Sequence, residues 1–113
     1  MIAPQWSRPK RSGSVSGLNV NFTPQAIADL SEIHSYIREF DRSAADRIML
    51  RIRQVIEIFE NLPLLGREGS IGGTREFAIS GLPYTIVYRI NSAVDLDILT
   101  IVHQRKLYPP QQD

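Results

Sequence analysis

The chain has 113 residues, which is enough for one domain but leaves no room for a second hydrophobic core. Hydrophobic residues make up 42% of it and charged residues 22%, a composition that indicates a globular chain and excludes an intrinsically disordered one. The formal net charge of +1 excludes nucleic-acid binding through overall charge, and no apolar run reaches the roughly 18 residues of a membrane-spanning helix.

Residues 1–17 contain two prolines, two glycines and four serines, and their apolar residues follow no period. We expect them to form a flexible N-terminal extension outside the folded domain. Arg8, Lys10 and Arg11 give this segment three positive charges, so residues 18–113 carry ten positive and twelve negative groups. No apolar leader follows the basic residues and the chain has no cysteine, so a cytoplasmic location is expected.

The first elements predicted within the domain are a short strand and a helix. Leucine, valine and phenylalanine alternate along residues 18–22, which is typical of a strand with one buried face. Thr23 and Pro24 then supply an N-cap and a first-turn proline, and the helix they begin is predicted to reach about Phe40. Its apolar positions recur at steps of three and four: Ile27, Leu30, Ile33, Ile37 and Phe40.

A second helix follows after a few residues. Ser43 and Asp46 have the spacing of a capping box at its start, and Pro63 ends it. Because the connection is so short, the two helices are expected to pack as an antiparallel hairpin. The predicted buried stripe of the second helix is Ile48, Ile52, Val55, Ile56, Phe59 and Leu62.

Three further strands are predicted in the C-terminal half, because the apolar period changes there from about 3.6 to 2. They cover residues 75–79, 84–90 and 96–102, after a loop "PLLGREGSIGG" that is expected to be flexible and lacks the Gly-Lys-Ser/Thr ending of a phosphate-binding loop. The order β-α-α-β-β-β predicts an α+β fold, with a helical hairpin on one face of an antiparallel sheet. Residues 18–108 would form this single domain, and 109–113 a C-terminal tail.

Four segments, "FTPQAIADLSEIHSYI", "ENLPLLGR", "REFAISGLPYTIVYRI" and "DILTIVHQRKLY", occur in an order and spacing that we recognise. Over residues 19–108 the chain resembles the RelE/ParE superfamily of bacterial type II toxin-antitoxin toxins. Members of this superfamily inhibit growth and act in plasmid stabilisation. The resemblance implies the α+β fold described above.

The two branches of the superfamily differ in activity. RelE-like members are ribosome-dependent mRNA endonucleases, whereas ParE-like members inhibit DNA gyrase and catalyse no reaction of their own. The pattern "GR…TREFAISGLPYTIVYR…H" is more similar to the ParE-like branch, and Glu76, Ala78 and Thr85 stand where the nuclease branch carries basic residues. The resemblance therefore favours gyrase inhibition. The alternatives are an mRNA endonuclease and a non-toxic relic that only binds an antitoxin.

The resemblance also implies partners. A cognate antitoxin is expected to neutralise the chain in a hetero-oligomeric, autorepressing complex, and the target would be DNA gyrase, or the ribosome with its mRNA in the alternative. No membrane partner and no cofactor are expected. Two histidines and scattered acidic residues suggest no metal site.

Candidate site residues follow for each activity. RNA cleavage needs a proton carrier and cations that face the phosphate, and the catalytic candidates are Arg75, His103, Arg105 and Tyr108. The resemblance implies that the C-terminal segment of the antitoxin binds on the sheet face without helices and in the groove of the helical hairpin. Arginines there would pair with its carboxylates, and apolar positions would accept its aliphatic side chains. The partner-binding candidates are Arg67, Arg75, Tyr84, Tyr88, Arg89 and Arg105. For the tyrosines, half-buried packing in the sheet is the alternative, and for His103 a structural or surface role.

Overall fold

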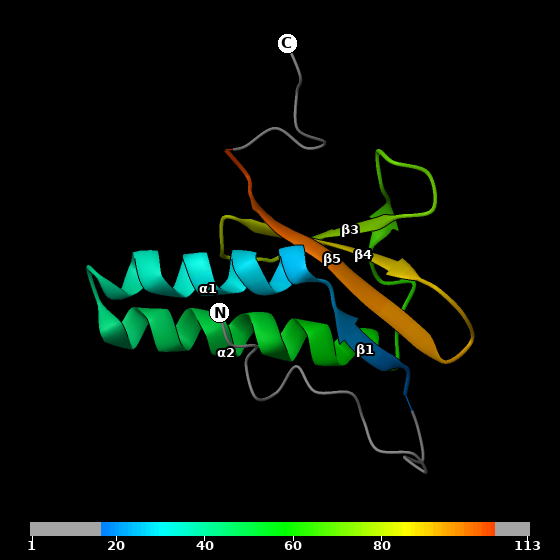
Figure 1. Ribbon diagram of the computed structural model, residues 1–113, viewed down its shortest axis with the longest axis horizontal. Coiled ribbons are helices and arrows are strands. Elements are labelled where there is room, and N and C mark those ends of the chain that lie inside the picture. Colours follow the sequence, from blue (N-terminus) through cyan, green and yellow to red (C-terminus); the bar gives the residue numbers. More distant parts are fainter. Residues whose placement is uncertain (1–16, 106–113) are drawn as a thin grey trace.

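The computed structural model describes residues 17–105, in which two helices pack against a five-stranded sheet (Figure 1). The predicted α+β class is therefore confirmed. Except for Gly17, the expected extension and tail lie outside the described residues, as does Tyr108. Neither helix in the described part of the chain is long and apolar enough to cross a membrane. The elements are β1 (Asn19–Phe22), α1 (Pro24–Arg38), α2 (Arg42–Phe59), β2 (Arg67–Glu68), β3 (Arg75–Ala78), β4 (Tyr84–Ile90) and β5 (Asp95–His103).

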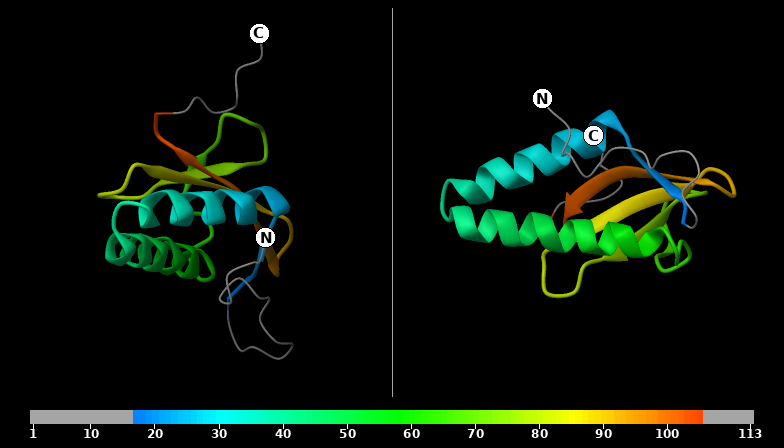
Figure 2. Two further views of the ribbon diagram at one scale, coloured as in Figure 1. Left: turned by 60° about the vertical axis from the view of Figure 1, so that its left-hand side comes forward. Right: turned by 90° about the horizontal axis from the view of Figure 1, so that it is seen from below.

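The sheet is mixed, with the strand order β1-β5-β4-β3-β2. β2 to β5 pair in antiparallel fashion, as predicted, but β1 pairs with β5 in parallel. The prediction of a wholly antiparallel sheet is wrong at this edge, because hydrophobic alternation does not encode which strand becomes a neighbour. The helical hairpin separates β1 from the other strands along the chain, and α1 and α2 lie side by side in both views of Figure 2.

Thr23 joins β1, α1 and β5. Its side chain accepts a hydrogen bond from the backbone N–H of Ala26 at 3.1 Å, which caps α1 as predicted, and its hydroxyl donates to the carbonyl of Leu99 at 2.8 Å. α1 ends at Arg38 rather than near Phe40. Phe40, the last of the predicted apolar positions, is 74% exposed because it follows the last helical turn.

The start of α2 also differs from the prediction. Asp41 is the N-cap in place of Ser43, and its carboxylate accepts a hydrogen bond from the backbone N–H of Ala44 at 3.0 Å. Leu62 lies beyond the end of α2 and is 57% exposed, so it is not part of the buried stripe. The rest of that stripe lies under the sheet, with Ile52, Val55, Ile56 and Phe59 buried.

Aromatic contacts identify the sheet face that the helices cover. Phe59 of α2 stacks on Tyr88 of β4, with ring centroids 4.2 Å apart, and meets Phe77 of β3 edge-on at 5.8 Å. Side chains two residues apart on a strand share a face. Tyr84 and Arg75 therefore also lie on the helix-covered face.

The loop between α2 and β3 is more ordered than predicted. It contains β2, which pairs with β3, and the buried Tyr88 hydroxyl anchors the chain just before it. This hydroxyl accepts from the backbone N–H of Gly66 at 2.7 Å and donates to the carbonyl of Pro63 at 2.8 Å. The glycine at position 66 is required, because a Cβ atom there would lie 2.7 Å from the Tyr88 oxygen.

Candidate functional site

A cavity of about 340 Å³ lies between α1 and the adjoining ends of β4 and β5. We call it the α1–β5 cavity. One wall comes from α1, the floor from the sheet, and the other wall from the residues where the chain leaves β5. Its lining residues are Asp29, Glu32, Ile33, Tyr36, Tyr84, Ile101, His103 and Arg105.

The α1 wall of the cavity carries two carboxylates, Asp29, which is hydrogen-bonded to β5, and Glu32, which is unpaired. Asp29 accepts hydrogen bonds from the backbone N–H of Ile101 at 3.0 Å, from the Thr100 hydroxyl and from the Gln25 amide at 2.8 Å. The pairing of β1 with β5 ends at Ile98, so no residue of β1 lies opposite Ile101. The Asp29 carboxylate accepts the hydrogen bond that a neighbouring strand would otherwise accept. Glu32 is exposed and makes no side-chain hydrogen bond or ion pair within residues 17–105. Glu32 is therefore the acidic group available to a partner.

The opposite wall presents hydrogen-bond donors. The backbone N–H of Arg105 donates to Nδ1 of His103 at 3.0 Å, so the neutral imidazole carries its proton on Nε2. The His103 ring stands edge-on to Tyr84, with centroids 5.5 Å apart. The Arg105 side chain is exposed and has no partner among the described residues.

Tyr84 forms part of the floor and is only 6% exposed. Its hydroxyl makes no hydrogen bond within the described chain, unlike that of Tyr88. Burial raises the pKa of the Tyr84 phenol, and the nearby Tyr36 phenol raises it further. The hydroxyl therefore stays protonated near neutral pH and can donate a hydrogen bond into the cavity.

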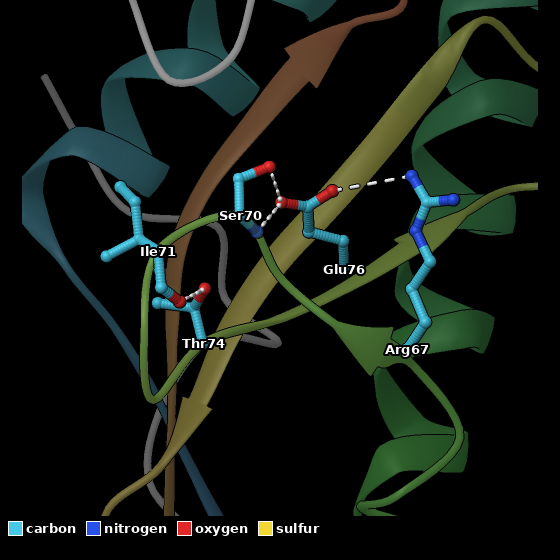
Figure 3. A network of polar contacts seen from close by, with 5 residues as sticks. All are labelled: Arg67, Ser70, Ile71, Thr74 and Glu76. Atoms are coloured by element: carbon cyan, nitrogen blue, oxygen red, sulfur yellow. Dashed lines mark hydrogen bonds and ion pairs between the residues drawn. The ribbon is translucent and has the colours of Figure 1, made fainter.

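A second hollow, of about 290 Å³, lies on the face without helices, and we call it the open-face hollow. Figure 3 shows Glu76 between Arg67 and Ser70. Glu76 is 8% exposed, accepts from the backbone N–H of Ser70 at 3.0 Å and lies 3.6 Å from the guanidinium of Arg67. This carboxylate offsets the charge of Arg67. The lining residues are Arg67, Glu76, Ala78, Thr85, Val102, His103 and Gln104.

Of the catalytic candidates within residues 17–105, Arg75 lies apart from His103 and Arg105. In the strand register, Arg75 of β3 lies opposite Tyr88 of β4, and His103 of β5 lies opposite Tyr84 of β4. Tyr84 and Tyr88 are four residues apart on β4. This separates Arg75 from His103 by about 13 Å along the strand direction, and β4 lies between them across the sheet. The Arg75 guanidinium also donates to the carbonyl of Gly66 at 2.6 Å, which holds it at the base of the 66–74 loop. Among the candidates that the structure describes, His103 and Arg105 line the same cavity. No cluster of three or more histidine or acidic residues within 17–105 is placed to hold a metal ion.

The partner-binding candidates also separate. Tyr88 has no exposed surface and serves the core, so its expected contact with a partner is wrong. Strand alternation turns Arg75, Tyr84 and Tyr88 toward the helices. Arg67, 80% exposed at its side chain, and the exposed Arg89 lie on the open side.

The sequence-based candidates omitted the α1 wall of the cavity. Asp29, Glu32, Ile33 and Tyr36 stand at positions i, i+3, i+4 and i+7, so they share one helix face. Charged and aromatic residues together on a face that also carries buried positions are a recognisable signal. The apolar period does not reveal this signal, because charged positions do not contribute to it.

Comparisons with known proteins identify the family of the chain and match its fold. Residues 20–108 match the family described as "ParE toxin of type II toxin-antitoxin system, parDE". The protein Y4kP of Sinorhizobium fredii (strain NBRC 101917 / NGR234), which is named as a candidate toxin, is 36% identical over 95 residues, covering 84% of this chain and 97% of Y4kP. A solved structure titled "Chromosomal ParDE TA system from P. aeruginosa" shares the fold with a TM-score of 0.69 at 19% identity, covering 76% of this chain and 95% of that one. The chain therefore belongs to the ParE toxin family of type II toxin-antitoxin systems.

Proposed function

We propose that this toxin inhibits DNA gyrase by protein contact and that a cognate antitoxin neutralises it by binding. The observation that carries the first part is the charge of the open-face hollow. A site that cleaves RNA needs cations aimed at the phosphate. Here Glu76, Ala78 and Thr85 line the hollow, and its arginine, Arg67, faces a carboxylate.

The dispersal of the catalytic candidates supports the same proposal. Arg75 is engaged by a backbone carbonyl and lies about 13 Å along the sheet from His103. His103 and Arg105 share their cavity with Asp29 and Glu32, whose negative charges oppose the approach of a phosphate. Inhibition through a protein surface requires no such convergence of groups.

Membership of the toxin family supports the antitoxin as a partner. The related fold in the solved structure comes from what its title calls a ParDE toxin-antitoxin system. The α1–β5 cavity offers unpaired charges of both signs, Glu32 and Arg105, which suits a protein segment of mixed charge. The expected state in the cell is a hetero-oligomer of toxin and antitoxin.

The direct test is ATP-dependent supercoiling of relaxed plasmid by purified gyrase. The purified chain is expected to stop supercoiling, and mixing it first with its cognate antitoxin should restore the reaction. A heat-unfolded sample of the chain is the matched control. Normal supercoiling in the presence of excess folded chain would refute the proposal.

A second experiment separates the alternatives in the cell. On induction without antitoxin, pulse labelling should show DNA synthesis falling before protein synthesis. The reverse order, with cuts mapped in mRNA by primer extension, would identify an endonuclease. Unimpaired growth with folded chain present would identify a non-toxic relic.

A further inference from the structure

Large apolar side chains are exposed in a row along α2. Leu50, Ile58 and Leu62 are 44–57% exposed, and the exposed Gln54 lies between the first two. Leu62 lies just beyond the helix but continues the row, since its backbone N–H donates to the carbonyl of Ile58 at 2.9 Å. Residues at intervals of four form one ridge on a helix, and we call these four residues the α2 ridge. The buried residues of α2 point the opposite way, because positions two apart on a helix differ in direction by about 200°.

The spacing of the α2 ridge is symmetric about Gln54. Leu50 stands four residues before it and Ile58 four residues after it. If a second copy of α2 runs antiparallel, with a two-fold axis at Gln54, Leu50 of each copy lies opposite Ile58 of the other. Ridges of this four-residue type pack against one another in the commonest class of helix pairs. The two Gln54 side-chain amides then meet at the axis, where each can both donate and accept a hydrogen bond.

The charges beside the ridge have the same symmetry. Before Gln54, α2 carries four arginines and one aspartate, whereas the remaining charged residue of the helix, Glu57, follows it. Arg51 and Glu57 stand three residues before and after Gln54, so an antiparallel copy places each Arg51 opposite Glu57 of the other copy. A copy in the parallel direction would place arginine opposite arginine. Both groups have capacity left: Arg51 uses one donor on the carbonyl of Ser80, and Glu57 uses one oxygen on Arg53.

We propose that this protein associates with a second copy of itself through the α2 ridge, in an antiparallel contact with two-fold symmetry. Leu50 packs on Ile58 of the other copy, and Arg51 pairs with Glu57 of the other copy. A contact made chiefly by one helix is smaller than the roughly 800 Å² per partner of a standard interface, so the dimer dissociates on dilution. The ridge is separate from the α1–β5 cavity, whose lining residues belong to α1, β4, β5 and the chain just after β5. The dimer is therefore independent of the proposed gyrase target.

Sedimentation equilibrium of the purified full chain tests the association. As the protein concentration rises through the micromolar range, the average mass is expected to rise from that of the monomer towards twice that value. Leu50→Lys and Ile58→Lys each place a charge in both symmetry-related contacts, so each should weaken the dimer Kd by about tenfold or more. Because both side chains are about half exposed, the fold tolerates either change.

A charge exchange tests the antiparallel register. Arg51→Glu brings two carboxylates together in each pair and Glu57→Arg two guanidinium groups, so each should weaken the Kd by about tenfold. The double variant, R51E with E57R, restores opposite charges between the copies and should return the Kd to within about threefold of the wild type. Residues six apart on one helix do not face each other, so this recovery reports on contact between copies.

Matched controls separate this contact from general effects of charge and folding. Val94→Lys makes the same kind of change at an apolar residue with 58% exposure, in the turn between β4 and β5. Arg38→Glu reverses an exposed arginine in the last turn of α1. Circular dichroism should show every variant folded at the temperature of the experiment, and the two controls should stay within about twofold of the wild-type Kd.

Each outcome has a distinct meaning. A monomer at every concentration would overturn the inference, and so would a dimer that Leu50→Lys and Ile58→Lys leave unchanged, because it would form through another face. Masses that grow beyond the dimer would indicate an open-ended contact instead of a two-fold one, which also overturns it. If the double variant stays as weak as the single charge reversals, the antiparallel register is wrong and the inference with it. Gyrase inhibition is decided separately by the supercoiling assay.

Discussion

Replacing Asp29 with alanine tests how the helical hairpin is fixed to the sheet. Asp29 lies on α1, half-buried, and accepts hydrogen bonds from the backbone N–H of Ile101 and the hydroxyl of Thr100 on β5. In Asp29→Ala no acceptor remains for the Ile101 N–H, because β1 ends before it reaches this part of β5. The Thr100 hydroxyl can rotate toward water, so the loss of its hydrogen bond to Asp29 lowers the free energy of unfolding by less.

The magnitude follows from the Ile101 contact. A hydrogen bond to a charged group contributes about 1.5–3 kcal/mol, and a buried donor left without a partner costs a similar amount. We expect the free energy of unfolding to fall by about 2–3 kcal/mol, out of a total of roughly 5–15 kcal/mol for a small domain. For a domain of this size, that corresponds to a decrease in Tm of roughly 10–20 °C.

Urea denaturation followed by far-UV circular dichroism measures this change. Glu32→Ala is the matched control, since Glu32 lies on the same wall of the cavity but makes no contact within the described residues. It should change the free energy of unfolding by less than about 0.5 kcal/mol. If Asp29→Ala is as stable as Glu32→Ala, Asp29 does not hold α1 to β5, and the reasoning is refuted.

Three further predictions concern the loop before β3 and the buried phenols. Gly66→Ala should lower the free energy of unfolding by about 1–3 kcal/mol, because the new Cβ would lie 2.7 Å from the Tyr88 oxygen. Gly72→Ala is the control: a Cβ there has nothing within 4 Å, so the urea midpoint should stay nearly unchanged. Glu76→Ala removes the acceptor of the Ser70 backbone N–H, so hydrogen exchange at Ser70 should become about tenfold faster or more, and unchanged protection would contradict the network of Figure 3. Burial raises the pKa of Tyr84 and of Tyr88 above the ordinary 10.0, so the folded state binds these protons more tightly than the unfolded state. The stability they contribute is complete below about pH 10 and is lost as the pH rises through the folded-state pKa, and Tyr84→Phe should reduce this loss in urea titrations at alkaline pH.

The part of the site that the sequence predicted is its sheet side. Tyr84, His103 and Arg105 were candidates, and the structure places all three around one cavity. Asp29 and Glu32 were not candidates, because a helix face becomes a wall only when a strand lies opposite it. Arg75 had seemed to belong with His103, but the strand register separates them along β4.

The sequence alone determined the types and order of the main elements. A change of the apolar period from about 3.6 to 2 is a local signal, and it distinguished the two helices from the C-terminal strands. The Thr23 cap was equally local, since the N–H that it accepts from, that of Ala26, lies within the first helical turn. The competition between Asp41 and Ser43 for the next cap was not settled by local pattern, because both residue types cap well.

Only the tertiary structure decided which surfaces meet. Alternation along a strand shows that Tyr84 and Tyr88 share a face, but it cannot show which face the helices cover, because that depends on packing against Phe59 of α2. The parallel pairing of β1 with β5 joins residues more than seventy positions apart, as the contact of Thr23 with Leu99 illustrates. Such contacts form because the folded chain buries apolar surface as a whole, and no short segment carries that information.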